Sequence, residues 1–228
     1  MRVLHHWPLD PGSRQARIAL GETKLAFQLQ LVRPFDGDPE LDALNPAGLP
    51  PVLVDDRAEA EGGRVVAVEA RAILEYLAEI APEAGLLPKG AAERAEARRI
   101  ANWFDRKFEA EVNAWLLAEK LEKRFTGGGA PDMAAIREGR EALRWHLDYL
   151  ASLLEHREGL AGPRYTLADI AAAAHLSCVD YLGDVPWEPY PAVKTWYERV
   201  KCRPAFRPLL DDRLPGVQPA SWYAELDF

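Results

Sequence analysis

The loss of strand signals after residue 82 constrains the fold more than any other feature of this sequence. Before that point the chain alternates between strand and helix patterns. After it, apolar residues recur only at helical spacing, in stripes from Ile100 to Leu116 and from Ile136 to Leu154. A stretch rich in Pro and Gly separates the two regimes. The sequence therefore predicts an α/β domain at 1–81, a linker at 82–92, an all-helical domain at 93–208 and a C-terminal extension at 209–228.

The first domain has an order of elements that fixes much of its sheet. Residues 2–6, 26–32, 52–54 and 65–67 read as strands, whereas 13–21 and 69–82 read as helices. The order is βαβ followed by ββα, which implies one parallel strand pair and one antiparallel hairpin. The polar turn at 55–63 would close that hairpin. We expect Ser13 to cap the first helix, Gly21 to end it, 26–32 to be half-buried and 39–44 to form a helical turn.

Charge and cysteine usage exclude several classes of function. The formal charge is −8 over 228 residues, which argues against binding to nucleic acid or to an anionic membrane surface. Cys178 and Cys202 have neither zinc-site nor disulfide-framework spacing, and Cys178 is expected to be a buried small hydrophobe. No segment is long and apolar enough for a bilayer span or a signal peptide. We expect a soluble cytoplasmic protein without a metal or a cofactor.

Four ordered motifs resemble the cytosolic glutathione-transferase superfamily. They are "NPAGLPPVL", "VEARAILEYL", "TLADIAAAA" and "YPAVKTWYERVKCRPAF". The resemblance implies a thioredoxin-like N-terminal domain, a helical C-terminal domain, a dimer and a cis peptide bond before Pro51. The sequence itself predicts a capping box in the third motif, because Thr166 and Asp169 can each bond the other's backbone amide.

The positions that bind glutathione in this superfamily are altered near the first strand. Asp10 and Gly12 stand where branches of the superfamily place a Ser or Cys that stabilises the thiolate. An ionised Asp10 would raise the pKa of a thiol beside it. Ser13 is the only nearby hydroxyl, and we interpret it as a helix cap in preference to a catalytic group.

The two other glutathione contacts of the superfamily are also lost. Pro50 precedes the expected cis-proline and has no N–H to donate to the ligand backbone. The superfamily's Glu-Ser pair reads Glu69-Ala70, so the hydroxyl that binds the γ-glutamyl carboxylate is missing. The sequence therefore predicts a glutathione-transferase fold that retains Pro51 as a structural residue but has no catalytic residue.

Aromatic residues at both ends of the chain suggest that function moved to protein binding. Trp7, Arg14 and Phe35 are expected near the mouth of the altered glutathione site, the old site, where they could bind a partner protein. The alternative is that Trp7 and Phe35 fill the groove of that site. The extension adds four partner-binding candidates, although it could instead dock on its own domain: Trp222, Tyr223, Leu226 and Phe228.

The two chain ends resemble one subgroup of the superfamily, the FtsZ-binding division proteins of alphaproteobacteria. That resemblance implies a cytoplasmic dimer at the division site, without enzymatic activity, that binds FtsZ polymers and affects filament architecture and constriction. The rival hypothesis is a glutathione transferase or peroxidase with an atypical site. A third is an adaptor for some other protein.

Overall fold

The computed structural model describes residues 1–57 and 63–228, and its N-terminal part is a small mixed sheet covered by helices. The strands are β1 (Arg2–His6), β2 (Gln28–Leu31), β3 (Val52–Asp55) and β4 (Val65–Val68), in the spatial order β2-β1-β3-β4. β1 pairs parallel with β2 and antiparallel with β3, and β3 pairs antiparallel with β4. The predicted βαβ-ββα arrangement is confirmed; the hairpin turn lies mostly outside the described residues.

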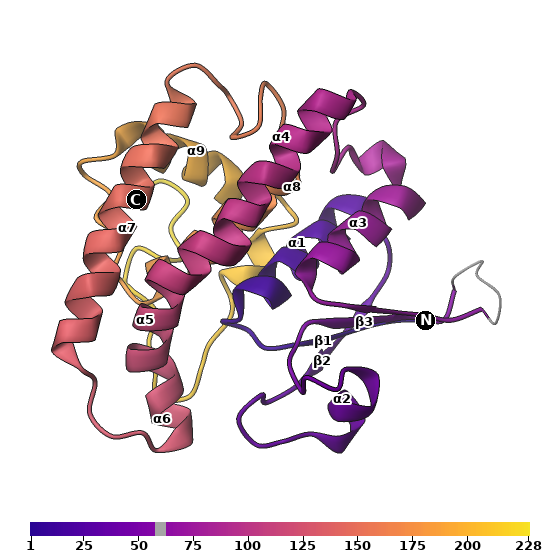
Figure 1. Ribbon diagram of the computed structural model, residues 1–228, viewed down its shortest axis with the longest axis horizontal. Coiled ribbons are helices and arrows are strands. Elements are labelled where there is room, and N and C mark those ends of the chain that lie inside the picture. Colours follow the sequence, from indigo (N-terminus) through magenta and orange to yellow (C-terminus); the bar gives the residue numbers. More distant parts are fainter. Residues whose placement is uncertain (58–62) are drawn as a thin grey trace.

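Helices cover the sheet and connect it to the second domain. α1 (Pro11–Thr23) and α3 (Ala70–Ile80) lie together on the face that points to the helical domain, and the short α2 (Pro39–Leu44) lies on the other side (Figure 1). A short 3₁₀ turn at Pro82–Ala84 leads out of the domain. α1 packs directly on α8 (Leu167–Tyr181), so the two domains share one hydrophobic core.

The C-terminal part is all helical, as predicted. Its first long rod joins α4 (Ala91–Asn102), α5 (Ala114–Leu117) and α6 (Lys123–Thr126) through two π-helical stretches, Trp103–Asn113 and Ala118–Glu122. α7 (Met133–Leu154) runs beside this rod, α8 is buried along its whole length, and α9 (Pro191–Lys201) and a 3₁₀ turn at Arg207–Leu209 follow (Figure 1). Among the described residues, no helix is long and apolar enough to cross a bilayer.

The ends of α1 differ from those predicted. Asp10, rather than Ser13, is the N-cap, and its carboxylate accepts from the Ser13 amide. Pro11 explains why the helix starts directly after Asp10, because the fixed φ of proline suits the first position of a helix. The helix runs past Gly21, where the chain packs against Ala205, and ends at Lys24 in the left-handed conformation with φ 56°. The predictions for Ser13 as cap and Gly21 as stop are therefore wrong.

The strand predicted at 26–32 also differs from expectation. All four residues of β2 are exposed, including Leu29 and Leu31. The alternation of apolar and polar residues predicts one buried face, but β2 is the edge strand of the sheet and both of its faces stay exposed in the protomer. Burial resumes only at Val32.

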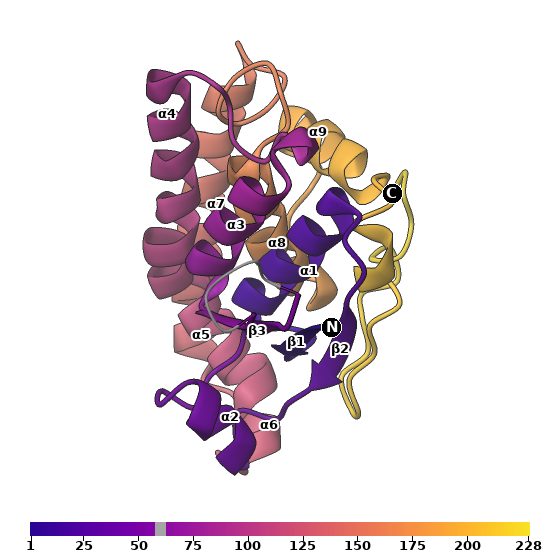
Figure 2. The ribbon, with the colours of Figure 1, turned by 90° about the vertical axis from the view of Figure 1, so that its right-hand side faces the viewer.

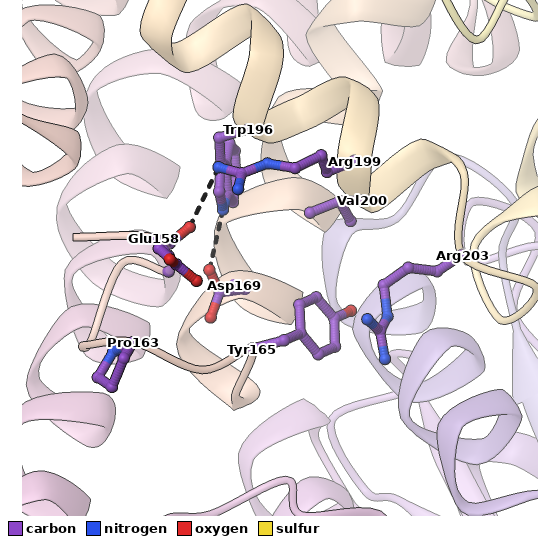
Figure 3. A pocket seen from close by; sticks show the side chains of 9 residues that line it. Glu158, Pro163, Tyr165, Asp169, Trp196, Arg199, Val200 and Arg203 are labelled. Carbon is purple, nitrogen blue, oxygen red and sulfur yellow. Dashed lines mark hydrogen bonds between the residues drawn. The ribbon is translucent and has the colours of Figure 1, made fainter.

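The capping box at the start of α8 is confirmed. Thr166 and Asp169 make both reciprocal bonds, and Asp169 also accepts from the Trp196 indole at 2.9 Å. A cavity of about 180 Å³ beside the box is shown in Figure 3. The side chain of Arg203 in its wall already has a partner, because it donates two hydrogen bonds to the Glu22 carboxylate at 2.6 and 2.8 Å. We therefore regard this region as a structural joint between α8 and α9.

Candidate functional site

The predicted cis peptide bond is present between Pro50 and Pro51 at the entrance to β3. The Pro51 carbonyl accepts from the Glu69 amide at 3.1 Å, which joins this turn to the start of α3. Pro50 lines a cavity but has no N–H, so the backbone at this point offers a ligand only a carbonyl. The fold-defining proline is retained, whereas the donor beside it is missing.

The start of α3 keeps an unusual backbone without its hydroxyl. Glu69 has φ 68° and ψ 149°, a conformation that costs a non-glycine residue roughly 1–3 kcal/mol. It precedes Ala70, which is buried and carries no polar group. This start therefore has the strained geometry of a ligand-binding turn but lacks the side-chain donor that a carboxylate would need.

The start of α1 has no group suited to thiolate activation. A Cβ added at Gly12 would lie 3.0 Å from Cδ of Pro51, so a Ser or Cys there would be crowded. Ser13 is fully buried, and its hydroxyl accepts from the Trp7 amide at 3.1 Å. Burial raises the pKa of Asp10 to about 6, against the hydrogen bonds from Ser13, so at neutral pH it is mainly an anion. An anion here disfavours a neighbouring thiolate.

Trp7 and Phe35 pack against each other at the mouth of the old site, together with Phe125. The Trp7 ring meets Phe35 and Phe125 edge-on with centroids 5.9 and 5.5 Å apart, and Phe35 and Phe125 are stacked at 5.8 Å. Trp7 is only 5% exposed. The structure therefore agrees with the plug alternative for Trp7, and the expectation that it is a surface anchor is wrong.

Arg14 is a core residue, so the expectation that it faces a partner is also wrong. Its side chain has no exposed area. It donates to the Pro8 carbonyl at 2.6 Å, to Ser177 at 2.7 Å and to the Tyr223 hydroxyl at 2.8 Å, and it pairs with Asp212 at 3.2 Å. These bonds join α1 to α8 and to the extension, and they satisfy a buried charge that would otherwise be costly.

The extension docks on its own protomer, in agreement with the alternative to partner binding. Tyr223 is completely buried and meets Tyr181 edge-on at 5.1 Å. The Trp222 indole donates to Asp180 at 3.1 Å, and the Phe228 ring lies 4.0 Å from the Lys201 ammonium. Figure 2 shows the yellow extension at the right-hand edge of the molecule, on the opposite side from α4. Trp222, Leu226 and Phe228 stay partly accessible, whereas Tyr223 is not available to a partner.

A buried charged cluster between the domains was not expected from the sequence. His175 on α8 lies 3.4 Å from Asp105 and 3.3 Å from Glu109, and the Gln15 amide donates to Asp105 at 2.8 Å. Arg71 on α3 also pairs with Asp105. No sequence signal indicated this cluster, because "AAAAHLSC" reads simply as an apolar helix. The cluster joins α1, α3 and α8 to the long rod.

The charged cluster predicts a pH-dependent stability. Burial alone would lower the pKa of His175, but the two carboxylates raise it to about 9. Because the folded pKa exceeds the unfolded value of about 6.5, the stabilisation is complete below pH 6.5 and disappears as the pH rises through 9. Wild type should therefore lose about 2 kcal/mol relative to His175→Gln between pH 6.5 and 8.5.

Urea unfolding of both proteins across that range measures this difference. Subtracting the variant removes the shared titrations of His6 and His146, whose pKa values burial lowers to about 4. If the difference in the free energy of unfolding between wild type and His175→Gln stays constant with pH, that result would contradict a charged His175.

The class of protein defined by this fold and site is confirmed by comparison with known sequences. The glutathione S-transferase N-terminal domain matches residues 4–85, and the glutathione S-transferase C-terminal domain matches 133–199. The chain belongs to the glutathione S-transferase family.

Within that family, the chain is similar over its whole length to "FtsZ-localized protein A" of Caulobacter vibrioides. The identity is 57% over 227 residues, which cover 100% of this chain and 98% of that protein. The solved structure of FzlA from C. crescentus has a TM-score of 0.95 at 57% identity and covers 100% and 99% of the two chains. A structure described as a glutathione S-transferase from Rhodospirillum rubrum F11 has a TM-score of 0.93 at 45% identity, with full coverage of both chains.

Proposed function

We propose that this protein is a non-enzymatic cell-division factor that binds FtsZ polymers as a dimer and regulates filament architecture and constriction. The observation that carries the proposal is the 57% identity with FtsZ-localized protein A, because it covers the whole chain and therefore includes the extension. On this proposal the protein is cytoplasmic, gathers at the division site, and needs neither a cofactor nor nucleic acid.

The altered glutathione site supports a role without catalysis. Gly12 offers no side chain, Ser13 is buried and bonded to Trp7, and Pro50 has no N–H. Each missing hydrogen bond to a ligand costs roughly 1–3 kcal/mol, so the losses together would weaken glutathione binding by several orders of magnitude.

The proposed dimer would use an aromatic surface on the helical domain. Trp145 is 50% exposed and stacks on Trp103 at 5.6 Å, and Tyr149 lies 4.4 Å from the same ring. Clustered exposed aromatics are typical of protein interfaces. We infer that a second copy covers this surface. A two-fold dimer presents each FtsZ contact twice, and linked weak contacts gain strongly through effective concentration.

The extension is the proposed contact with FtsZ. Its aromatic residues hold it in place, while Glu225 and Asp227 project into solvent between them. Trp222, Leu226 and Phe228 stay partly accessible in the docked extension, so a polymer could reach both their edges and the carboxylates. A docked extension is already ordered and loses little further entropy on binding.

The rival function is a glutathione transferase or peroxidase, and the relatives that carry the transferase name favour it. We expect wild type to show no retention on immobilised glutathione and no conjugation activity. The double variant Pro50→Val, Ala70→Ser should bind glutathione at least about 10-fold more tightly, because it restores one backbone donor and one hydroxyl. Calorimetric titration measures both proteins.

Micromolar glutathione binding by wild type would overturn the non-enzymatic proposal. So would a turnover that is lost in Ser13→Ala or Asp10→Ala. If neither glutathione nor FtsZ polymer binds and a lysate pull-down captures another protein, the adaptor hypothesis gains support instead.

A further inference from the structure

A cavity remains beside Pro50, even though the site no longer suits glutathione. It measures about 250 Å³ and lies between the loops that follow β1 and β2 and the long helical rod. Trp7, Phe35 and Leu117 are among its apolar walls. It is smaller than the 300–1,000 Å³ of pockets that enclose drug-sized ligands, so it suits one side chain or a small molecule.

The charge of this cavity is entirely negative. Three carboxylates line it, from Asp10, Glu109 and Glu122, and no Lys, Arg or His is among its lining residues. Asp10 accepts from the Ser13 amide and Glu109 pairs with His175, but Glu122 has no cationic partner among the described residues. Burial and the charge of Glu109 raise the pKa of Glu122, the direction expected for a carboxylate in a negative field.

An independent polar group in the wall also lacks a partner. Trp7 is 5% exposed, and its indole N–H makes no hydrogen bond within the described part of the chain. Most buried donors in native proteins are bonded, so an orphan donor beside a cavity indicates an acceptor that the chain does not itself provide. The wall thus combines anions, aromatic rings and a spare donor.

We propose that this cavity binds an organic cation, the ammonium or guanidinium group of a lysine- or arginine-like ligand. The cation would lie between Glu122 and Asp10, and its alkyl stem would pack on Phe35 and Leu117. Aromatic rings and carboxylates together are the groups that bind such cations in proteins. A carbonyl next to the stem would accept from the Trp7 indole. The inference goes beyond the proposed function and does not depend on it.

Calorimetric titration of the full-length protein tests the proposal with four probes. N-acetyl-lysine methylamide and N-acetyl-arginine methylamide represent a partner's side chain, n-butylamine represents a free amine, and N-acetyl-norleucine methylamide is the uncharged control. At least one cationic probe should bind about 10-fold or more tightly than the norleucine compound. Tighter binding of the amino-acid amides identifies a protein ligand, and tighter binding of butylamine identifies a small metabolite.

Matched variants locate the site. Glu122→Gln should weaken cation binding at least about 5-fold, and Glu122→Lys should abolish it. Glu141→Gln removes an exposed carboxylate from α7 outside the cavity and should leave binding unchanged. The proposal is overturned if the norleucine compound binds equally well, if no cationic probe saturates the protein, or if Glu122→Gln and Glu141→Gln behave alike.

Discussion

Replacing Arg14 by Met is expected to lower the free energy of unfolding by about 3–5 kcal/mol. The substitution keeps the apolar stem but removes the donors that now satisfy Pro8, Ser177, Tyr223 and Asp212. These acceptors are buried or partly buried, and water cannot easily replace the lost bonds. Because one bond reaches Tyr223, the extension should also loosen.

Urea unfolding measures the stability loss, and amide hydrogen exchange over 209–228 measures the loosening. Arg33→Met is the matched control, because Arg33 is 54% exposed and its pair with Asp36 contributes little. Arg14→Lys should recover only part of the loss, since an ammonium cannot reproduce the fork of a guanidinium. If Arg14→Met and Arg33→Met cost the same, the buried network has no special role.

The second large effect concerns FtsZ binding. Deleting 221–228 is expected to abolish co-sedimentation with FtsZ polymers while the protein remains a dimer. The deletion removes Tyr223 from the core as well as the exposed carboxylates, so some loss of stability will accompany it. For that reason the surface variant Glu225→Gln, Asp227→Asn is the sharper test, because both side chains are exposed and the core stays intact.

We expect this surface variant to weaken polymer binding at least about 10-fold if the docked extension makes the contact, since charge complementarity steers such encounters. Tyr223→Phe is the matched core control: it removes the hydroxyl that bonds Arg14 but changes no exposed group. It should lower stability by about 1–3 kcal/mol and leave FtsZ binding at the wild-type level. The reverse pattern would show that the extension acts only as a structural strap.

Local signals explain which parts of the fold could be predicted from the sequence. The strand and helix order, the capping box of Thr166 and Asp169 and the cis bond at Pro51 depend on short patterns or on the family resemblance. The start of α1 was predicted wrongly because Asp10 and Ser13 are both good N-caps, and only Pro11 at the first helical position separates them.

The candidate site was harder to predict, because its contacts join residues far apart in the chain. Arg14 bonds Tyr223 across 209 positions, and no spacing rule links an arginine in the first helix to an aromatic residue in the extension. Arginine and aromatic residues are common at protein interfaces, so the sequence suggested a partner surface. In the structure these side chains find their hydrogen-bond and packing partners within the same protomer. Chemical absences were easier to predict: the missing N–H of Pro50 and the missing hydroxyl of Ala70 follow from residue identity alone.

Co-sedimentation with FtsZ polymers is the most direct test of the proposed FtsZ binding. Full-length protein should pellet with FtsZ assembled in GTP and stay in the supernatant without FtsZ, and the Glu225→Gln, Asp227→Asn variant should pellet much less at equal dimer content. The proposed role in binding FtsZ is contradicted if the full-length dimer stays in the supernatant at saturating polymer, whatever the behaviour of the variants.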